Sequence, residues 1–543
     1  MAKVISKPLA LAVAVDLTLG GSFGAGAPAF AQEGTIPEEG VNKVLPGASL
    51  IEEGNVFSLT LHKRTNPPVG DRMDTTGELI ENPGGQPLPG AKFEITRVVG
   101  DVRTQTGLNS MVNLINDYNN QMTNAVQTEQ ATKQEGTTGE NGLLKFDNLK
   151  AGAYLVRETQ APAGTDGQTY VPGRPFLVLV PMTNAEGTAW NREVHAYPKN
   201  AEVRIDKQVQ DANKHAKDEQ RDEESSEVTY TLNGVVPQAP EGKTLREFVI
   251  RDSYNDSELE FAEGFTPVVE RIPAGNGQPE TISANLYRLD RDAALPNNRE
   301  NIAEGANKAF SITFDEAGLN AAGLTGGDTV RVTVKAKMLK AADQQIENSV
   351  NESGIFRDPF SSHEFETPND KVTSYIGNIR VIKEDENNNN IKLAGAEFEL
   401  FRCEDHQEIL NGAHEKVIER RTTDENGEIT FEGIHVSDWV NDAAPDVVTE
   451  YCLDEVVAPE GYMITREEPY RIKLNRDSKA FVGEGPNDRQ TIRLASLTVT
   501  NLPNSDRPVL PSTGGMGILI VALLGLGIIA GGVYAARRNS AKA

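Results

Sequence analysis

Residues 154–164 read YLVRETQAPAG, and residues 451–462 repeat the pattern as YCLDEVVAPEGY. Both stretches begin with a tyrosine, carry a glutamate four residues later (Glu158 and Glu455), and continue into an Ala-Pro pair and a glycine. A short apolar run that ends at a turn containing Pro and Gly is typical of a β-strand. These stretches therefore predict two strands of the same kind, each with one glutamate at a fixed position.

Two further pairs of stretches accompany this repeat. LPGAKFEI at 88–95 returns as LAGAEFEL at 393–400, and TTGENGLLKF at 137–146 returns as TTDENGEITF at 422–431. The three motifs keep the same order in both parts of the chain. This is the pattern that two copies of one domain produce.

The rest of the chain is also dominated by strand signals. Alternating runs such as EVTYTLNG at 227–234, AFSITF at 309–314 and TVRVTVKAKM at 329–338 are separated by Gly, Pro and Asn turns, which indicates antiparallel sandwiches. The exception is GLNSMVNLINDYNNQMTNAV at 107–126, which predicts one helix inserted in the first domain. Its apolar residues keep helical spacing: Met111, Leu114, Ile115, Tyr118, Met122 and Val126.

Length and composition exclude several classes of protein. The chain has 543 residues, a formal net charge of −27, two cysteines and seven histidines. This length suggests about three domains. The negative charge argues against nucleic acid as a partner, because binding to phosphates needs a basic face. So few cysteines and histidines give little support to a metalloenzyme, and we expect no cofactor.

The N-terminus has the layout of a secretory signal peptide. Two lysines precede an apolar stretch, which Asp16 interrupts, and AFA at residues 29–31 is a small-x-small cleavage site. We expect residues 1–31 to be removed and the mature protein to start near Gln32.

The C-terminus carries a second targeting segment. The apolar run at 516–536 is long enough to cross a hydrocarbon core of ~30 Å as a helix, and two arginines, Arg537 and Arg538, follow it. Directly before it stands the pentapeptide LPSTG, formed by Leu510, Pro511, Ser512, Thr513 and Gly514. A plain membrane anchor would not need this pentapeptide. The three-part arrangement resembles the sorting signal of Gram-positive surface proteins, which implies that a sortase cleaves between Thr513 and Gly514 and transfers the Thr513 acyl group to an amine.

WNREVHAYPKN at residues 190–200 indicates which amine accepts that acyl group. The stretch resembles the pilin motif of sortase-assembled pili, in which an aromatic residue and a valine precede Tyr-Pro-Lys-Asn. Pro198 lacks a backbone donor and keeps the chain extended, so we expect Lys199 to project from an exposed edge. The resemblance implies that Lys199 accepts Thr513 of a neighbouring copy. One donor end and one acceptor lysine per subunit give a head-to-tail contact that cannot close, and therefore a fibre.

The repeated domains resemble the B-type domains of collagen-binding surface proteins, which are inverse immunoglobulin-like sandwiches common in pilins. The middle region looks like a related but distinct sandwich. The expected fold is therefore all-β, with three tandem immunoglobulin-like β-sandwich domains and a helical insertion in the first. The expected segments are a signal peptide at 1–31, domains at 32–200, 201–374 and 375–503, and a sorting signal at 504–543.

Each of the three expected domains offers a lysine, an acid and an asparagine. The sets are Lys63, Glu158 and Asn200 in the first domain, Lys207, Asp252 and Asn348 in the middle one, and Lys383, Glu455 and Asn501 in the last. In the pilin domains that these resemble, such sets form spontaneous Lys–Asn isopeptide bonds. Burial lowers the pKa of a lysine and raises that of a carboxyl group. A neutral amine can then attack the amide carbon while the acid moves protons. The alternative is that these abundant residue types are ordinary surface residues.

The two cysteines, Cys403 and Cys452, both lie in the last domain. An exported protein with two such cysteines is expected to join them in a disulfide. DENNNNIKLAGA at 385–396 has some likeness to a calcium loop, but Asn390 stands where that loop needs Gly and Ala396 where it needs Glu. We expect a polar hairpin there and assign no metal ligands.

Two functions of different classes are compatible with these features. The first is the structural shaft subunit of a covalent pilus on the cell surface, and the second is a monomeric adhesin anchored to the cell wall. The pilin motif alone separates them, and it favours the pilus. The resemblance implies as partners other copies of the chain, a class C-type pilus sortase, a housekeeping sortase, minor tip and base pilins, and cell-wall peptidoglycan. An enzyme is the least supported class, because no nucleophile with its base and no cofactor loop is recognisable.

Overall fold

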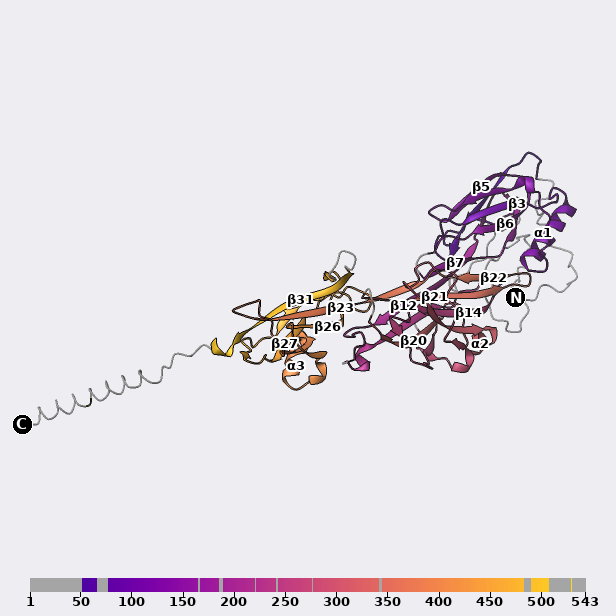
Figure 1. The fold of residues 1–543 in the computed structure, drawn as a ribbon. Helices are drawn as coiled ribbons and strands as arrows, with labels where there is room; N and C mark the ends of the chain where they lie inside the picture. Colours follow the sequence, from indigo (N-terminus) through magenta and orange to yellow (C-terminus); the bar gives the residue numbers. More distant parts are fainter. Residues whose placement is uncertain are drawn as a thin grey trace, which may run out of the picture. The chain divides into compact units, whose positions relative to one another are not determined.

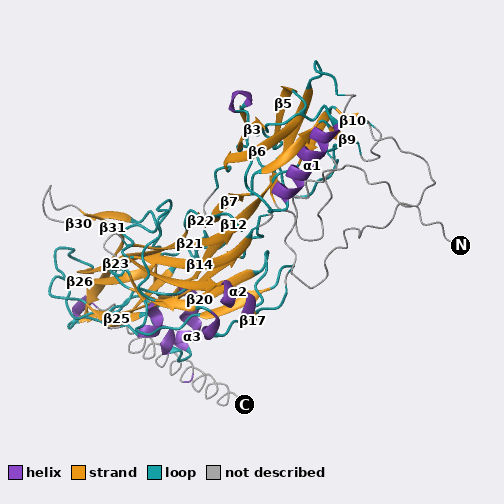
Figure 2. Cartoon of the chain, turned by 90° about the vertical axis from the view of Figure 1, so that its right-hand side faces the viewer, coloured by secondary structure: helices purple, strands orange, loops and turns teal. Residues whose placement is uncertain are grey.

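The computed structural model describes residues 51–65, 77–164, 167–184, 189–219, 221–240, 243–275, 277–340, 344–482, 490–506 and 529. The expected signal peptide, the LPSTG motif and the apolar run at 516–536 lie outside these residues, residue 529 apart. No helix within the described residues is long and apolar enough to span a membrane. The chain divides into two compact units, formed by residues 1–376 with 439–446 and by 377–438 with 447–543. Strands dominate in both units (Figures 1 and 2).

The first unit contains two large hydrophobic cores, and the first of these lies between two sheets. One sheet has the order β11 (Glu193–Ala196), β1 (Phe57–His62), β5 (Leu143–Leu149). The other has the order β4 (Gln134–Thr137), β3 (Lys92–Arg97), β6 (Gly152–Gln160), β8 (Phe176–Val180). Alternate apolar side chains of both sheets, such as Leu59, Phe93 and Val156, are buried between them. The alternation in the sequence therefore produces a sandwich.

The predicted helical insertion is α1 (Gln105–Asn119), which lies beside the strands of this core (Figure 1) and packs on β8. The Thr104 hydroxyl caps its start by accepting a hydrogen bond from the Gly107 amide at 3.1 Å. The helix is shorter than the apolar spacing predicted, because Gln121 has a φ of 62°, which a right-handed helix does not allow. The prediction was therefore wrong for Met122 and Val126, which lie beyond the end of the helix.

The second core of this unit lies between two larger sheets. The first sheet contains β12 (Lys199–Gln210), β13 (Glu227–Val235), β20 (Thr329–Met338) and β16 (Val268–Ile272). The second contains β19 (Lys308–Asp315), β14 (Thr244–Tyr254), β21 (Gln345–Arg357) and the start of β23 (Asp370–Asp385). Alternate residues of β13, among them Val228, Tyr230 and Leu232, point into the core and are buried.

Short elements complete the first unit. They are β2 (Arg64–Thr65), β7 (Gln168–Pro172), β9 (Met182–Thr183), β10 (Trp190–Asn191), β15 (Leu259–Glu260), β17 (Glu280–Thr281), β18 (Arg288–Asp290), β22 (Ser362–Glu366) and α2 (Glu316–Ala321). Residues 439–446 also belong to this unit, where the Asn441 backbone amide donates to Asp211 Oδ1 at 2.6 Å. Nothing in the sequence indicated that residues 439–446 belong to the first unit. The domain boundaries at 200 and 374 stay predictions.

The second unit repeats the first core. β23 pairs in parallel with β31 (Gln490–Pro503), and a four-stranded sheet has the order β25 (Glu419–Thr422), β24 (Glu397–Arg402), β27 (Tyr451–Val457), β29 (Tyr470–Ile472). The remaining elements are β26 (Glu428–His435), β28 (Tyr462–Met463), β30 (Lys479–Val482) and α3 (His406–Leu410). Between β3 and β6 the register shifts between Lys92 and Phe93, so that Phe93 pairs with Glu158. Between β24 and β27 the register shifts at the equivalent position, and Phe398 pairs with Glu455. The quoted repeat thus folds alike in both places.

The predicted disulfide between Cys403 and Cys452 is present. Cys452 lies in β27 and is buried, and Phe401 pairs with it across the neighbouring strand β24. The bond joins residues 49 positions apart, so it closes a loop that the unfolded chain would otherwise leave open.

We expect Cys403→Ala to lower the free energy of unfolding of the second unit by about 2–4 kcal/mol, because the unfolded chain regains the freedom of the closed loop. Differential scanning calorimetry of the oxidised full chain measures this as a downward shift of one transition. A reducing agent should reproduce the shift in the wild-type chain and have no further effect on the variant. Equal melting of oxidised wild type and variant would contradict this prediction.

Candidate functional site: three buried lysine, acid and asparagine clusters

The first cluster joins three residues that the sequence predicted as a set. Lys63 and Asn200 are both fully buried. Lys63 Nζ lies 2.7 Å from Glu158 Oε2 and also donates a hydrogen bond to Asn200 Oδ1. Asn200 Nδ2 in turn donates to Glu158 Oε1 at 2.8 Å. Each of the three side chains therefore contacts the other two.

The cluster in the second unit has the same arrangement with looser contacts. Lys383 lies in β23, Asn501 in the parallel neighbour β31, and Glu455 in β27 of the other sheet. Lys383 Nζ lies 3.5 Å from Glu455 Oε2, and Asn501 Nδ2 donates to Glu455 Oε1 at 2.7 Å. Lys383 Nζ also lies 3.5 Å from the Val499 carbonyl oxygen. The acid again contacts both the amine and the amide.

The other two repeated motifs hold the backbone of these lysines. The Lys63 amide donates to the Gly142 carbonyl at 2.8 Å, and the Leu88 amide donates to the Lys63 carbonyl at 2.9 Å. In the second unit, Lys383 makes the same two bonds with Gly427 and Leu393, at 2.7 and 2.9 Å. All three motifs of the repeat therefore meet at the lysine, and they fix its direction into the core.

The middle cluster is built differently. Lys207 comes from β12 in one sheet, whereas Asp252 in β14 and Asn348 in β21 belong to the other sheet. Lys207 Nζ forms an ion pair with Asp252 Oδ2, and both side chains are fully buried. Asn348 is fully buried as well, but neither its amide nitrogen nor its amide oxygen has a hydrogen-bond partner in the described part of the chain.

Burial shifts the acid–base behaviour of these groups. Burial lowers the pKa of the Lys63 and Lys207 amines, and the neighbouring carboxylates partly oppose the shift. Burial likewise lowers the pKa of the Lys383 amine to about 8. The pKa values of Asp252 and Glu455 are raised, also chiefly by burial. These shifts favour the neutral amine, which is the form that can act as a nucleophile.

Lys199 does not lie where the sequence predicted. Its residue is only 6% exposed, so the expectation of a lysine on an exposed edge was wrong. The reason is that the start of β12 has neighbours on both sides: Lys199 pairs with Arg64 of β2, and Asn200 pairs with Pro172 of β7. The preceding Tyr197 is also buried, and its hydroxyl accepts a hydrogen bond from the Ile80 amide at 2.6 Å.

Two other predictions about binding concern metal ions and the polar hairpin. Among the residues that the structure describes, no group of three or more His, Cys, Asp or Glu side chains could hold a metal ion. In the expected hairpin, an isolated bridge joins Glu384 to Lys392, and Asp385 Oδ1 accepts the amide of Asn387 at 2.7 Å. The polar hairpin is therefore formed, and Asp385 is part of its turn.

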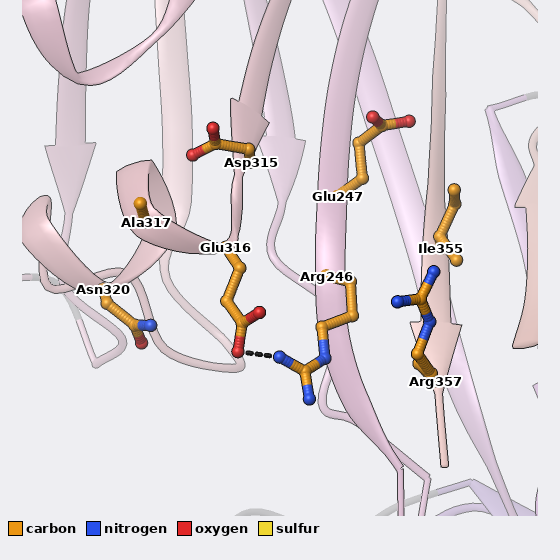
Figure 3. Close-up of a pocket in the computed structure, with 8 residues that line it drawn as sticks. All are labelled: Arg246, Glu247, Asp315, Glu316, Ala317, Asn320, Ile355 and Arg357. Atoms are coloured by element: carbon orange, nitrogen blue, oxygen red, sulfur yellow. Dashed lines mark ion pairs between the residues drawn. The ribbon is translucent and has the colours of Figure 1, made fainter. Parts of the chain in front are cut away.

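A cavity of about 610 Å³ lies in the first unit, apart from the residues of the three clusters (Figure 3). It is lined by Arg246, Glu247, Asp315, Glu316, Ala317, Asn320, Ile355 and Arg357. A register shift between Leu245 and Glu247 falls at Arg246, whose guanidinium forms an ion pair with Glu316. Sequence reasoning missed this cavity, because no motif marks it. Its charges of both signs partly neutralise one another, so we assign it no ligand.

Comparisons with known proteins agree with this architecture. Residues 54–201 match the family described as Gram-positive pilin subunit D1, N-terminal domain, and residues 377–485 match the prealbumin-like fold domain. The chain is 28% identical over 540 residues to fimbrial subunit type 1 of Actinomyces viscosus, covering 91% of this chain and 92% of that protein. It is 24% identical to fimbrial subunit type 2 of Actinomyces naeslundii, covering 89% and 90% of the two chains.

Two solved structures share the fold. The full-length major pilin SpaD from Corynebacterium diphtheriae has a TM-score of 0.57 and 24% identity, with 84% of this chain and 98% of that chain covered. The fimbrial protein FimP from Actinomyces oris has a TM-score of 0.52 and 22% identity, with 84% and 100% covered. The fold is therefore that of tandem immunoglobulin-like β domains.

The buried Lys383 amine predicts a pH dependence of stability in a chain that cannot form a cross-link. Burial lowers the pKa of the folded amine to about 8, from the usual 10.5, and Asn501 is not among the groups that shift it, so we expect Asn501→Ala to keep this pKa low. Between these values the unfolded state binds more protons, so the free energy of unfolding of the second unit should rise with pH from about 8 upward. Urea denaturation at about pH 7.5, 8.5 and 9.5 measures this. Adding Lys383→Met should abolish the rise, and a flat profile in Asn501→Ala alone would contradict the prediction.

Proposed function

We propose that this chain is the structural shaft subunit of a covalent surface pilus. Sortase joins Thr513 of one copy to Lys199 of the next, and internal Lys–Asn isopeptide bonds stabilise each copy. The fimbrial relatives support the pilus. The three buried clusters of lysine, acid and asparagine support the internal bonds most directly.

The partners and location follow from this role. A class C-type pilus sortase would catalyse polymerisation, and a housekeeping sortase would attach the finished fibre to cell-wall peptidoglycan. Minor pilins would occupy the tip and the base. The pilus would thus stand on the cell surface and support cell adhesion, without catalytic activity of its own toward outside substrates.

Each internal bond would form in the same balanced step. The neutral lysine Nζ attacks the asparagine Cγ atom, a new C–N bond forms, and the bond from Cγ to Nδ2 breaks. The acid takes a proton from the attacking amine and gives one to the leaving nitrogen, which departs as ammonia. Glu158 contacts both Lys63 Nζ and Asn200 Nδ2, which suits this transfer between the two nitrogen atoms.

The strand β12 supports the link between assembly and internal bonds. Lys199, Asn200 and Lys207 all lie on this strand. Tension that enters a subunit at Lys199 would pass to the next residue, Asn200, and through the proposed bond to Lys63. The load would thus run through covalent bonds instead of resting on folding free energy alone, which is roughly 5–15 kcal/mol for a domain.

The burial of Lys199 adds a requirement to assembly. An acyl acceptor must reach the sortase thioester, and Lys199 is only 6% exposed. Assembly would therefore need a local opening at the start of β12, which costs less free energy than global unfolding. The proposed bond at Asn200 would confine that opening to the residues before it.

The role of Lys199 is tested by co-expression with the pilus sortase and immunoblotting for a ladder that resists heat and SDS. We expect Lys199→Ala to give exported monomer and no ladder. Lys199→Arg should also fail, because a guanidinium stays protonated and is a poor nucleophile. The control is Lys145→Ala, which removes a half-exposed lysine of β5 and should leave the ladder intact. An undiminished ladder from Lys199→Ala would instead favour a different acceptor, and monomer alone from the wild type would favour the anchored adhesin.

The role of Glu455 is tested by intact-protein mass spectrometry. The wild-type chain should lose about 17 Da as ammonia for each of three bonds, beyond two hydrogens for the disulfide. Glu455→Ala should lose one ammonia fewer, because the acid that moves protons is gone while Lys383 and Asn501 remain. The free energy of unfolding of its second unit should also fall by ~4–5 kcal/mol, the entropic contribution of a closed loop of ~100 residues, and this unit should therefore melt at a lower temperature.

Asp454→Ala is the matched control for this variant. Asp454 is the preceding residue of β27, and among the described residues the ion pair to Lys383 and the hydrogen bond from Asn501 are made by Glu455 and not by Asp454, so all three bonds should form. A full mass loss in Glu455→Ala would mean that another group moves the proton. A wild-type mass without any loss of ammonia would mean that no isopeptide bond forms, and would contradict this part of the proposal.

A further inference from the structure

The sheet that carries Glu158 ends in an apolar edge strand, β8. In the order β4-β3-β6-β8 this strand is the last, and all five of its residues, FLVLV at 176–180, are apolar and buried. An edge strand presents backbone N–H and C=O groups that have no partner in their own sheet, so another chain can add a strand to it. An edge as apolar as this one therefore needs to be closed.

Every second residue of β8 directs its backbone groups toward this edge. The Val98 amide donates to the Ala153 carbonyl at 2.8 Å, so the backbone of Ala153 in β6 faces the side of β3 and not that of β8. Ala153 is the residue that pairs with Leu179 of β8. In an antiparallel ladder such a pair exchanges no hydrogen bonds, so the backbone of Leu179, and that of Leu177 two residues earlier, faces away from β6.

Asn119, the last residue of α1, occupies the backbone of Leu177 with its side-chain amide. Asn119 Nδ2 donates to the Leu177 carbonyl oxygen at 3.0 Å, and the Leu177 amide donates to Asn119 Oδ1, also at 3.0 Å. These are the two bonds that a residue of a neighbouring antiparallel strand would make. The helix thus takes the place of a strand at this position.

Two prolines limit the rest of the edge. Pro175 and Pro181 stand directly before and after β8, at the next edge-facing positions of the same alternation. A proline has no backbone N–H to offer, which is why prolines occur where an edge has to be protected. With Leu177 occupied by Asn119, a strand added from outside could find an N–H donor at Leu179 at most.

The second unit protects the equivalent edge by charge. Its strand β29 is the last of the repeated sheet, and the register of β29 on β27 repeats that of β8 on β6. Where β8 has Leu177 and Leu179, β29 and the residue after it have Arg471 and Lys473, which are both exposed. Charged side chains are a common means of keeping other chains away from an edge strand. The two copies of the repeat thus protect the same edge by different means.

We propose that α1 is an edge guard, which prevents a second copy of this chain from adding a strand to β8. A second copy is the expected partner because it carries the same apolar edge, and two identical edges can pair antiparallel about a twofold axis. The edge guard depends neither on the isopeptide bonds nor on Lys199. It complements the proposed function, in which copies are to be joined by the covalent link alone.

The first test measures hydrogen exchange of single amides in the full chain by mass spectrometry. Asn119→Ala removes the side-chain amide but keeps the apolar face that holds α1 in the first core, and alanine favours a helix more than asparagine does. We expect the Leu177 amide to exchange about tenfold faster, because a buried donor loses its partner. The matched control is Asn109→Ala on the same helix, where the exposed Asn109 accepts from Gln105, and it should leave this exchange unchanged.

The second test measures association of the same chains by light scattering over a range of concentrations. Asn119→Ala is combined with Pro175→Ala, which restores an N–H donor at the edge. We expect this double variant to form a dimer at concentrations at which the wild type and Asn109→Ala show no such change. Exchange of the Leu177 amide should then slow again as the concentration rises, because the second copy supplies the missing partner.

The possible outcomes are distinct. A wild-type exchange rate of the Leu177 amide in Asn119→Ala, or an equal acceleration by Asn109→Ala, would overturn the edge guard. Faster exchange without concentration-dependent association of the double variant would overturn the second copy as the partner that α1 excludes. The sortase ladder and the loss of ammonia are separate readouts, so a failure of the edge guard is distinguishable from a failure of the proposed function.

Discussion

The burial of a lysine amine is the constraint on which the rest of this structure depends. A charged amine in an apolar core is strongly disfavoured unless it has a partner, and removing one member of a buried pair is costly. Lys63, Lys207 and Lys383 are each buried in the core of a sandwich, and each lies beside one carboxylate. The acid therefore has to come from a strand that faces the lysine across the core, and this requirement fixes which strands of the two sheets must lie opposite each other.

The repeated motifs have a structural role, because they surround such a lysine and hold its backbone in place. The motif with Gly142 approaches the Lys63 backbone so closely that a Cβ atom on this glycine would lie 2.3 Å from the Lys63 carbonyl oxygen. Its φ of 71° also favours glycine. Gly427 meets the same two conditions at Lys383, with 2.7 Å and 69°. The glycine of each TT-ENG motif is therefore required by the hydrogen bonds that hold the lysine, and not by the turn alone.

The sequence predicted correctly those features that depend on residues close together in the chain, on a repeated motif, or on the presence of two cysteines. Alternation predicted the strands, the repeat predicted two similar cores, and two cysteines in an exported domain predicted the disulfide. The burial of Lys199 could not be predicted in this way, because it depends on β2 and β7, which are distant in the sequence and flank β12. Nor does the sequence around Asp252 or Asn348 reveal that their strands are neighbours in one sheet while Lys207 comes from the other. Such features depend on how strands are ordered, which local pattern does not encode.

This difference in strand order would give the proposed bonds different mechanical roles. Lys383 and Asn501 lie on parallel neighbouring strands, and Lys63 directly precedes β2, the parallel neighbour of the strand that carries Asn200. A bond at these positions prevents one strand from sliding along the next. A bond from Lys207 to Asn348 instead joins the two sheets and prevents them from separating. β12 would carry one bond of each kind, at Asn200 and at Lys207. A strand held to its neighbour at one end and to the opposite sheet further along cannot be peeled away from either end. Lys199 directly precedes the first of these bonds, so a subunit joined there would load the most firmly held strand of the fold.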